Sequence, residues 1–333
     1  KILTANEGEP RMGYANGVSD PAGSVTIIDT ATGSANTVGF DAFDGEKRQE
    51  LVKAGVVLMK NTQPSVDLEP EYIACTNGMA YVTLQEANAI AVLDLAQGTF
   101  TGIYSAGFED YSKAPVDIDK GDSVYAPSTY AGLKGIRMPD GIALYTVGDT
   151  DYLLTANEGD AREWDKYSNE NEVGKGHASP AGNITKGMVN GKVVYFKSSD
   201  FDGLDPQTDY LFGGRSFTLY RVDGSALTEV FTSGSDFEAK TASYLSDYFN
   251  CSNDDRSIDD RSGKKGPEPE TVTVGKVDGR SYAFVTLERI GGVMVYDITD
   301  PANVAYVNYI NSRDFSEDVA ADDSPEGLKF IDA

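Results

Sequence analysis

The stretch EPETVTVGKVDGRSYAFVTLERIGGVMVYDI, at residues 268–298, decides the fold. Its short segments are rich in β-branched and aromatic residues and are separated by glycine-containing turns, which is typical of antiparallel strands. A Pro-acid step opens the first segment, Glu288 ends the second, and an aliphatic-Asp signature closes the third. We read the stretch as most of a repeated unit of about four strands.

Looser copies of the unit occur elsewhere in the chain. One is EPEYIACTNGMAYVTLQEANAIAVLDL at 69–95, and another is PDGIALYTVGDTDYLLTANEGDAR at 139–162. The fourth strand of the second copy is delayed until GGRSFTLYRV at 213–222, beyond a long insertion. The pentapeptide TANEG stands at both 4–8 and 155–159. Self-similarity of this kind predicts an all-β fold, a β-propeller with long rim insertions and a few short helices, at 45–55 and 236–249. A solenoid or a sandwich stays open as an alternative.

The two ends of the chain fit the same scheme. SPEGLKFIDA at 324–333 is an opening without a second strand, and KILTANEG at 1–8 is a second strand without an opening. Either the termini join in one blade, or the chain is a processed segment of a longer propeller, which we favour. We predict a single domain over 1–333, with blade-like units at about 1–40, 68–108, 137–232, 268–313 and 324–333.

Composition limits the partners and the location. Lys and Arg total 28 against 53 Asp and Glu, a formal charge of −25 that repels nucleic acid and favours cations. No apolar run approaches the ~20 residues that span a bilayer, so we predict no membrane insertion of this segment. The acidic, turn-rich and Cys-poor composition favours an exported protein that is extracellular, on the cell surface or periplasmic.

The scarcity of His and Cys limits the chemistry. With a single His and two Cys, the chain has neither a zinc-type cluster nor a Ser/His/Asp triad. Any bound metal should therefore be a hard cation with oxygen ligands, such as calcium. Whether Cys75 and Cys251 form a disulfide stays open, because one lies in an expected strand and the other in a polar loop.

Repeated acids are the main candidate site. If equivalent strands line a central channel, one ring of carboxylates comes from the ends of second strands and another, expected one strand-length away, from the starts of first strands. Such rings need protons, Arg partners or a hard cation to offset their repulsion. The first ring comprises Glu7, Glu86, Glu158 and Glu288, and the second comprises Glu71, Asp140, Glu270 and Glu326.

Arginines accompany the acids at Arg11, Arg162, Arg215 and Arg289. One reading is structural, with each carboxylate capping a turn and pairing with an Arg that locks neighbouring blades. The other is catalytic, with carboxylates holding Ca²⁺ and guanidinium forks binding phosphate oxygens. Both readings stay open.

Asp-rich loops add a weaker calcium signal. DIDKGD at 117–122 alternates Asp with other residues but lacks the Gly and Glu of an EF-hand, so a solvated acidic loop is favoured there. NDDRSIDD at 253–260 and DFDGLDPQTD at 200–209 receive the same interpretation. Together these loops indicate dependence on a divalent cation.

Collinear motifs along the chain resemble the choice-of-anchor I family. They are TANEGEP, GSVTIID, LEPEYIA with VTLQEANAIAVLDL, MPDGIA with LLTANEGDARE, FGGRSF, GPEPETVTVG, LERIGGVMVYDITDPAN, NSRDF and SPEGLKFI. The resemblance implies a bacterial surface or secreted propeller of the seven-bladed type, related to mesenchyme-specific cell-surface glycoproteins, of which this chain would be an incomplete part. Some bacterial relatives are labelled alkaline phosphatases, and the animal relatives are associated with calcium mineral.

Three functional hypotheses follow. The leading one is an exported or cell-surface binding module, stabilised by Ca²⁺, for an unknown surface ligand. The first alternative is a Ca²⁺-dependent phosphomonoesterase that takes a phosphorylated small molecule, with the four arginines as catalytic residues. The second alternative is a structural spacer of a larger adhesin. Whether the protein is an enzyme is left open at this point.

Overall fold

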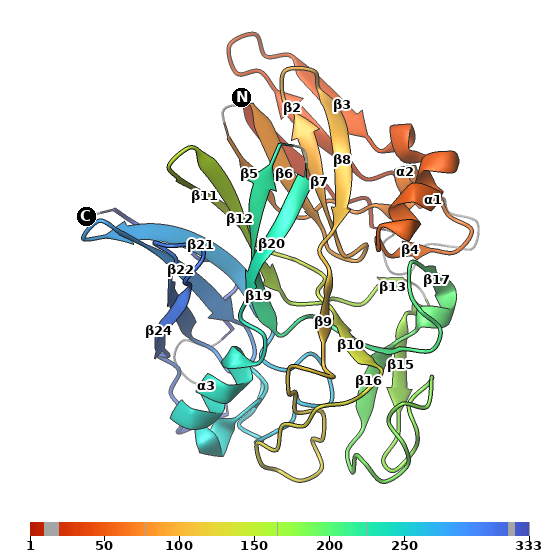
Figure 1. The fold of residues 1–333 in the computed structure, drawn as a ribbon, viewed down its shortest axis with the longest axis vertical. Coiled ribbons are helices and arrows are strands. Elements are labelled where there is room, and N and C mark those ends of the chain that lie inside the picture. The colour runs from red at the N-terminus through yellow and green to blue at the C-terminus, as the bar shows by residue number, and fades with distance from the viewer. Residues whose placement is uncertain (10–19, 77, 165, 225, 319–323, 333) are drawn as a thin grey trace.

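Four antiparallel sheets, each built from strands in chain order, dominate the structure (Figure 1). The computed structural model describes residues 1–9, 20–76, 78–164, 166–224, 226–318 and 324–332. The strands of the four sheets are, in order, β1 (Ile2–Asn6), β2 (Ser24–Ile28) and β3 (Ala35–Gly39); β5 (Ile73–Cys75), β6 (Met79–Leu84), β7 (Ala89–Asp94) and β8 (Thr99–Ser105); β11 (Ile142–Val147), β12 (Thr150–Asn157), β19 (Ser216–Asp223) and β20 (Ala226–Thr232); β21 (Pro269–Val277), β22 (Arg280–Leu287), β23 (Val293–Asp297) and β24 (Ala305–Ile310).

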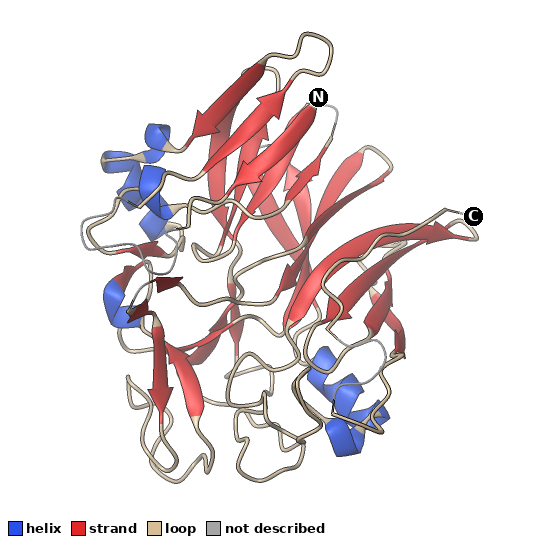
Figure 2. Ribbon diagram, turned by 180° about the vertical axis from the view of Figure 1, so that it is seen from behind, coloured by secondary structure: helices blue, strands red, loops and turns tan. Residues whose placement is uncertain are grey.

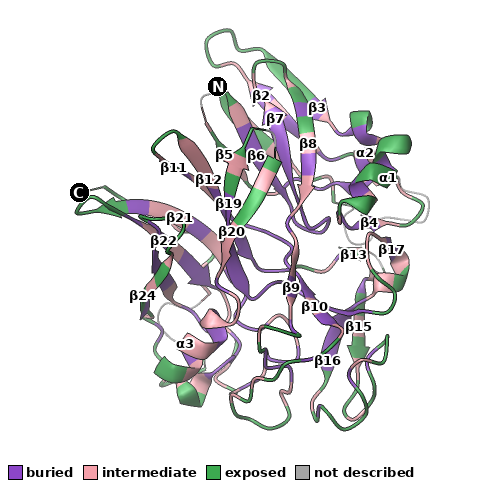
Figure 3. Ribbon diagram, viewed as in Figure 1, coloured by how far each residue is buried: buried purple, intermediate pink, exposed green. Residues whose placement is uncertain are grey.

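The sheets pack face to face, and a hydrophobic core fills each space between them. Successive residues of a strand point to opposite faces. Accordingly Tyr81 and Val82 of β6 belong to different cores, as do Leu153 and Leu154 of β12. Figure 3 shows buried residues concentrated in these strands. Burial on both faces explains why the strands are nearly continuous apolar runs rather than alternating ones.

The first strands of the sheets are neighbours in space. Strand β1 lies against β5, β5 against β11, and β11 against β21, so the sheets follow one another around a common side, as Figure 2 shows from behind. Consecutive antiparallel sheets with adjoining first strands are the blades of a β-propeller. The predicted all-β, propeller-type fold is thus confirmed. The single-domain boundaries and the choice between a ring and a segment stay predictions.

The long insertion predicted in the third unit is confirmed, but the strand that follows it, β19, is the third of its sheet and not the predicted fourth. Strand β12 pairs with β19, from Asn157 opposite Ser216 to Tyr152 opposite Arg221, although the two strands are far apart in the sequence. Small sheets occupy the insertion and the loops around it, at the lower right of Figure 1. Their strands are β4 (Leu58–Met59), β9 (Phe108–Asp110), β10 (Leu133–Ile136), β13 (Glu163–Trp164), β14 (Tyr167–Ser168), β15 (Glu170–Val173), β16 (Val193–Phe196), β17 (Phe201–Asp202) and β18 (Asp209–Phe212).

Helices are few and short. The two predicted helices are α1 (Glu46–Lys53) and α3 (Asp236–Tyr244), and the structure adds α2 (Pro64–Asp67). The described part of the chain also has the 3-10 turns η1 (Asp41–Phe43), η2 (Ser198–Asp200) and η3 (Ser246–Tyr248). Within the described ranges, no helix combines the length and the apolar character that crossing a membrane would require.

The C-terminal segment lies on the fourth sheet without forming a strand. The Phe330 ring stacks on Phe284 of β22 at 5.6 Å between centroids. The Thr271 hydroxyl donates to the Glu326 carbonyl. No strand is assigned between 324 and 332. The opening strand predicted for SPEGLKFIDA is therefore not formed, because the segment contacts β21 and β22 through side chains rather than through a backbone ladder.

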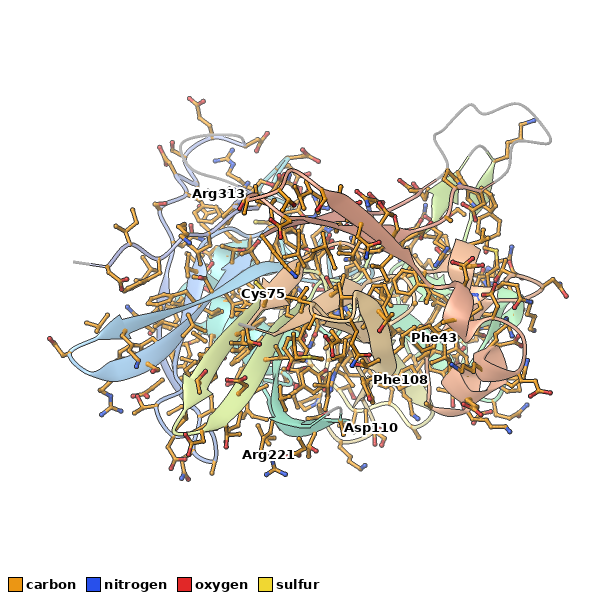
Figure 4. All side chains as sticks on the ribbon, turned by 90° about the horizontal axis from the view of Figure 1, so that it is seen from above. Phe43, Cys75, Phe108, Asp110, Arg221 and Arg313 are labelled. Carbon is orange, nitrogen blue, oxygen red and sulfur yellow. The ribbon has the colours of Figure 1, made fainter. Side chains whose placement is uncertain are left out.

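The two cysteines are unpaired. Cys75 is exposed in β5 (Figure 4), whereas Cys251 is fully buried, and burial raises the pKa of its thiol to about 11. Because the thiolate is the reactive form, we expect a maleimide to label one thiol per native chain and two after denaturation, as read by mass. Labelling of both thiols in the native protein would contradict this arrangement.

Candidate functional site

Antiparallel pairing brings the two predicted rings of acids to the same end of the sheets. The backbone N–H of Asp140 donates to the Ala156 carbonyl at 2.9 Å, which places Asp140 beside the end of β12 and Glu158. Pro269 likewise pairs with Leu287, beside Glu270 and Glu288. The expected separation by one strand-length is therefore wrong, since a hairpin returns its second strand to the start of its first.

Asp140, Glu158 and Glu270 form a compact group, here called the acidic cluster. One carboxylate oxygen from each lies within 4.8 Å of the others. The Gly141 N–H donates to the Glu270 carbonyl at 3.1 Å and joins the third sheet to the fourth. A Cβ on Gly141 would lie 2.7 Å from that carbonyl oxygen, so a larger residue would force the two sheets apart. The cluster therefore sits at a close contact between two blades.

A second close contact fixes the position of Glu158. Gly159 and Gly213 adopt φ values of 85° and 73°. A Cβ on Gly159 would lie 2.1 Å from the Gly213 nitrogen, and one on Gly213 would lie 2.1 Å from the Glu158 carbonyl oxygen. Only glycine fits this approach, which explains the Gly of TANEG and the first Gly of FGGR. The repeated pentapeptide thus holds a carboxylate at a strand end.

Burial and mutual repulsion disfavour charge in the acidic cluster. Burial, followed by the charges of Glu270 and Glu158, raises the pKa of Asp140 to about 10. Burial and Glu158 raise the pKa of Glu270 to about 8. Burial raises the pKa of Glu158 to about 7, although the Lys265 ammonium opposes the shift. Near neutral pH the cluster needs either protons or an added cation.

One atom of the cluster lacks a donor. Oδ2 of Asp140 is buried and accepts no hydrogen bond, and the carboxyl group faces that of Glu270. Glu158, by contrast, accepts from the Gln85 amide and the Lys265 ammonium, each at 2.7 Å. Two ionised carboxylates are both acceptors, so only a shared proton or a cation can join Asp140 to Glu270.

The second sheet contributes acids beside the cluster. Burial, then the charges of Glu86 and Glu7, raises the pKa of Glu71 to about 9. Burial and Glu69 raise the pKa of the buried Glu86. Glu7 and Glu326 are exposed. Neither belongs to a compact group of three acids in the described chain. Of the eight predicted acids, the structure therefore gathers Asp140, Glu158 and Glu270 most closely.

A different kind of group surrounds Glu268, here called the ion-pair network. Glu158, Glu268 and Glu288 also bring oxygens within 4.8 Å of one another, but three cations stand among them. Oε2 of Glu268 lies 3.0 Å from Lys265 Nζ and 2.9 Å from Arg289 Nη2, and Oε1 pairs with Arg261. Burial alone would raise the pKa of Glu268, but the charges of Lys265 and Arg261 outweigh burial and lower the pKa to about 2.

Sequence reasoning missed Glu268 and Lys265. The second ring was predicted from the acid that follows the proline of each unit, whereas Glu268 precedes Pro269. The spacing of Lys265 and Glu268 at i,i+3 was the available signal. An acid within reach of a cation in a polar insertion is common, so that signal alone would not have separated this buried pair from a solvated one.

The predicted arginines are engaged in ion pairs within the protein. Arg162 is buried, with Nη1 at 3.2 Å from Asp67 and 3.1 Å from Glu69. Arg289 contacts Glu268 and Glu288, each at 2.9 Å. Of the three predicted arginines that the structure describes, Arg289 is the one that forms an ion pair with a predicted acid, Glu288. Arg11 lies outside the described residues.

Arg215 is held through both of its terminal nitrogens. Its Nη1 contacts Glu238 at 2.6 Å and the Asp117 carbonyl at 2.7 Å, and its Nη2 donates to the carbonyls of Ser262 and Lys264, both at 2.8 Å. The side chain is buried and joins three loops. This pattern matches the structural reading of the repeated arginines.

Comparisons with known proteins found a curated relative and several solved structures of low similarity. A mesenchyme-specific cell surface glycoprotein of Strongylocentrotus purpuratus is 29% identical over 240 residues, which cover 60% of this chain and 31% of the relative. The chain thus spans about a third of that relative's length. A solved 6-phosphogluconolactonase candidate from Bacteroides fragilis superposes with a TM-score of 0.30 and 11% identity, covering 93% of this chain and 67% of that one.

Another solved structure, the RRP9 WD40 repeats, superposes with a TM-score of 0.27 and 9% identity over 87% of this chain and 62% of that one. The propeller-type fold itself follows from the strand order of the four sheets. The sequence model of the choice-of-anchor I domain matches residues 1–301, most of the chain. The protein therefore belongs to the choice-of-anchor I family.

Proposed function

We propose that the protein is an extracellular or cell-surface binding module whose acidic cluster holds a calcium ion between two blades. The family and the relative named as a cell surface glycoprotein support the location. The observation that carries the calcium proposal is the buried Oδ2 of Asp140, which accepts no hydrogen bond although it faces a second carboxyl group. A buried acceptor in this state calls for a proton or a cation.

The geometry of the acidic cluster suits calcium. Ca²⁺ takes oxygen ligands at 2.3–2.6 Å, so oxygens on opposite sides of the ion stand about 5 Å apart. The three oxygens of the cluster lie within 4.8 Å of one another. Glu71, whose charge contributes to the raised pKa of Asp140, adds a fourth carboxylate nearby. Water would complete the usual six to eight ligands.

Charge balance favours the acidic cluster over the ion-pair network. In the network, Arg261, Lys265 and Arg289 already offset Glu268 and its neighbours. In the acidic cluster, Lys265 contacts Glu158 alone. A divalent cation would therefore be attracted by the carboxylates of Asp140 and Glu270, which no cation of the described chain contacts. Beside Glu268 it would be repelled by the three cations of the network.

The phosphomonoesterase alternative gains no support from the arginines. Phosphoryl transfer would need guanidinium groups aimed at the metal-bound phosphate. Arg162 and Arg215 instead pair with Glu69 and Glu238. We expect p-nitrophenyl phosphate to remain intact with the protein in calcium and in chelator, and turnover that depends on calcium would favour the enzyme. The spacer hypothesis predicts that no ion binds.

Calorimetric titration of the whole chain with calcium tests the proposal. We expect Asp140→Asn to lower the number of bound ions by one or to weaken one site at least tenfold, because it removes a ligand charge. Glu50→Gln, at an exposed position on α1, is the control and should bind as the wild type does. Glu270→Gln is the second variant if Asp140→Asn folds poorly. Unchanged binding in both cluster variants would contradict the proposal.

A further inference from the structure

Two rim insertions that are far apart in the sequence meet beside α3. The loop at 107–132 and the loop at 252–270 are joined by an ion pair from Lys120 Nζ to Asp260 Oδ1 at 2.5 Å. Arg215 ties both loops to the third sheet through the carbonyls of Asp117 and Ser262. This meeting point is separate from the acidic cluster in its residues, and it contains Asp117, Asp122 and Asp259, here called the rim acids.

Asp259 is the central member of the rim acids. It is fully buried, and its Oδ1 accepts from the Ser262 hydroxyl. Its Oδ2 is also buried and has no hydrogen-bond donor. The carboxyl group meets that of Asp122, which comes from the other insertion and is exposed. A buried acceptor opposite a second carboxyl group is the same unsatisfied arrangement that Asp140 shows.

Asp117 adds a third carboxylate to the rim acids. Its carboxylate is fully buried and accepts from the backbone N–H groups of Asp119 at 3.1 Å and Ala126 at 2.6 Å. The neighbouring cations are committed elsewhere, Arg215 to Glu238 and Lys120 to Asp260. Burial, moderated by Ala126 and increased by Glu238, raises the pKa of Asp117 to about 6.

We propose that a hard divalent cation of the calcium class binds at the rim acids, between Asp122 and Asp259 and next to Asp117, and fastens the two insertions together. The ion would replace the missing donor at Asp259 Oδ2 and offset the charge of the trio. The trio is not among the groups of three acids whose oxygens lie within 4.8 Å in the described chain. One of its members would therefore reach the ion through a water molecule, as occurs in calcium loops.

This inference goes beyond the proposed function, and calcium titration separates the two. The whole chain should bind one ion at each place. Asp259→Asn should remove one ion, Asp140→Asn should remove the other, and the double variant should remove both. Because Asp259 is buried, Asp122→Asn at an exposed position provides a second variant, with an expected loss of at least tenfold in affinity at one site. Asp254→Asn, an exposed acid of the same loop, is the matched control.

Limited proteolysis locates the effect. We expect calcium to slow cleavage within 107–132 and 252–270 in the wild type and in Asp140→Asn, and to give no protection there in Asp122→Asn or Asp259→Asn. If both rim variants keep the wild-type number of ions and the same protection, the pair shares a proton instead and the rim site is refuted. Loss of binding in the Asp140→Asn variant alone would support the proposed function and refute the rim site.

Discussion

Replacing Glu268 with Gln should lower the free energy of unfolding by about 3–5 kcal/mol, because it breaks a buried ion-pair group. Glu268 is fully buried and pairs with Arg261, Lys265 and Arg289. Gln keeps the size but removes the charge, so the cations that it offset stay desolvated without their partner. Urea unfolding, followed by circular dichroism, measures the change as a shift of the midpoint at constant slope.

A surface ion pair gives the matched control. Glu172 pairs with Lys192 at 2.7 Å, with exposed side-chain fractions of 54% and 61%. Because water already solvates both groups, Glu172→Gln should leave the free energy of unfolding nearly unchanged. If Glu268→Gln costs no more than Glu172→Gln, then the ion-pair network does not lock the fourth sheet to the insertion.

More of the fold than of the candidate site could be predicted from the sequence. The unit repeats strand, turn and strand with apolar runs, and burial on both faces of a blade imposes that pattern on every copy. The return of GGRSFTLYRV to the third sheet across the insertion could be predicted, but its place could not, because it forms the third strand, β19, paired with β12, rather than the predicted fourth. The short helix at Pro64–Asp67 was missed, since four residues carry no helical periodicity.

The candidate site could be predicted in kind but not in arrangement. Repetition marked Glu158 in one predicted ring and Asp140 and Glu270 in the other, and the hairpin brings the two rings together because it places the start of one strand beside the end of the next. The sequence did not show which arginines reach them. Arg162 pairs with Glu69 and Arg215 pairs with Glu238, and neither acid is among the eight that the sequence predicted. Such pairings depend on how the insertions fold, and the repeat does not encode that.

Without calcium, the protein should lose stability as the pH rises from 6 to 8. The pKa values of Asp140, Glu270 and Glu71 are raised from 3.8, 4.5 and 4.5 to about 10, 8 and 9, first by burial and then by neighbouring carboxylates. In this pH range the folded state therefore holds protons that the unfolded state has released. The stability that these groups contribute is complete below pH 4 and is lost as the pH rises through their folded pKa values, by at most about 1.4 kcal/mol per pH unit for each extra proton.

Calcium should remove most of this dependence, because an ion replaces the protons as the source of positive charge. Glu268, with its pKa near 2, stays ionised throughout and adds no opposing slope. Thermal melts at pH 6, 7 and 8, in chelator and in excess calcium, should diverge as the pH rises. Asp140→Asn, which lacks one of the titrating groups, should show a shallower slope in chelator and little response to calcium at the cluster. A chelated wild type whose stability is constant or rises between pH 6 and 8 would show that the buried carboxyl groups are already ionised and balanced within the protein, which would leave the cluster without a need for a cation.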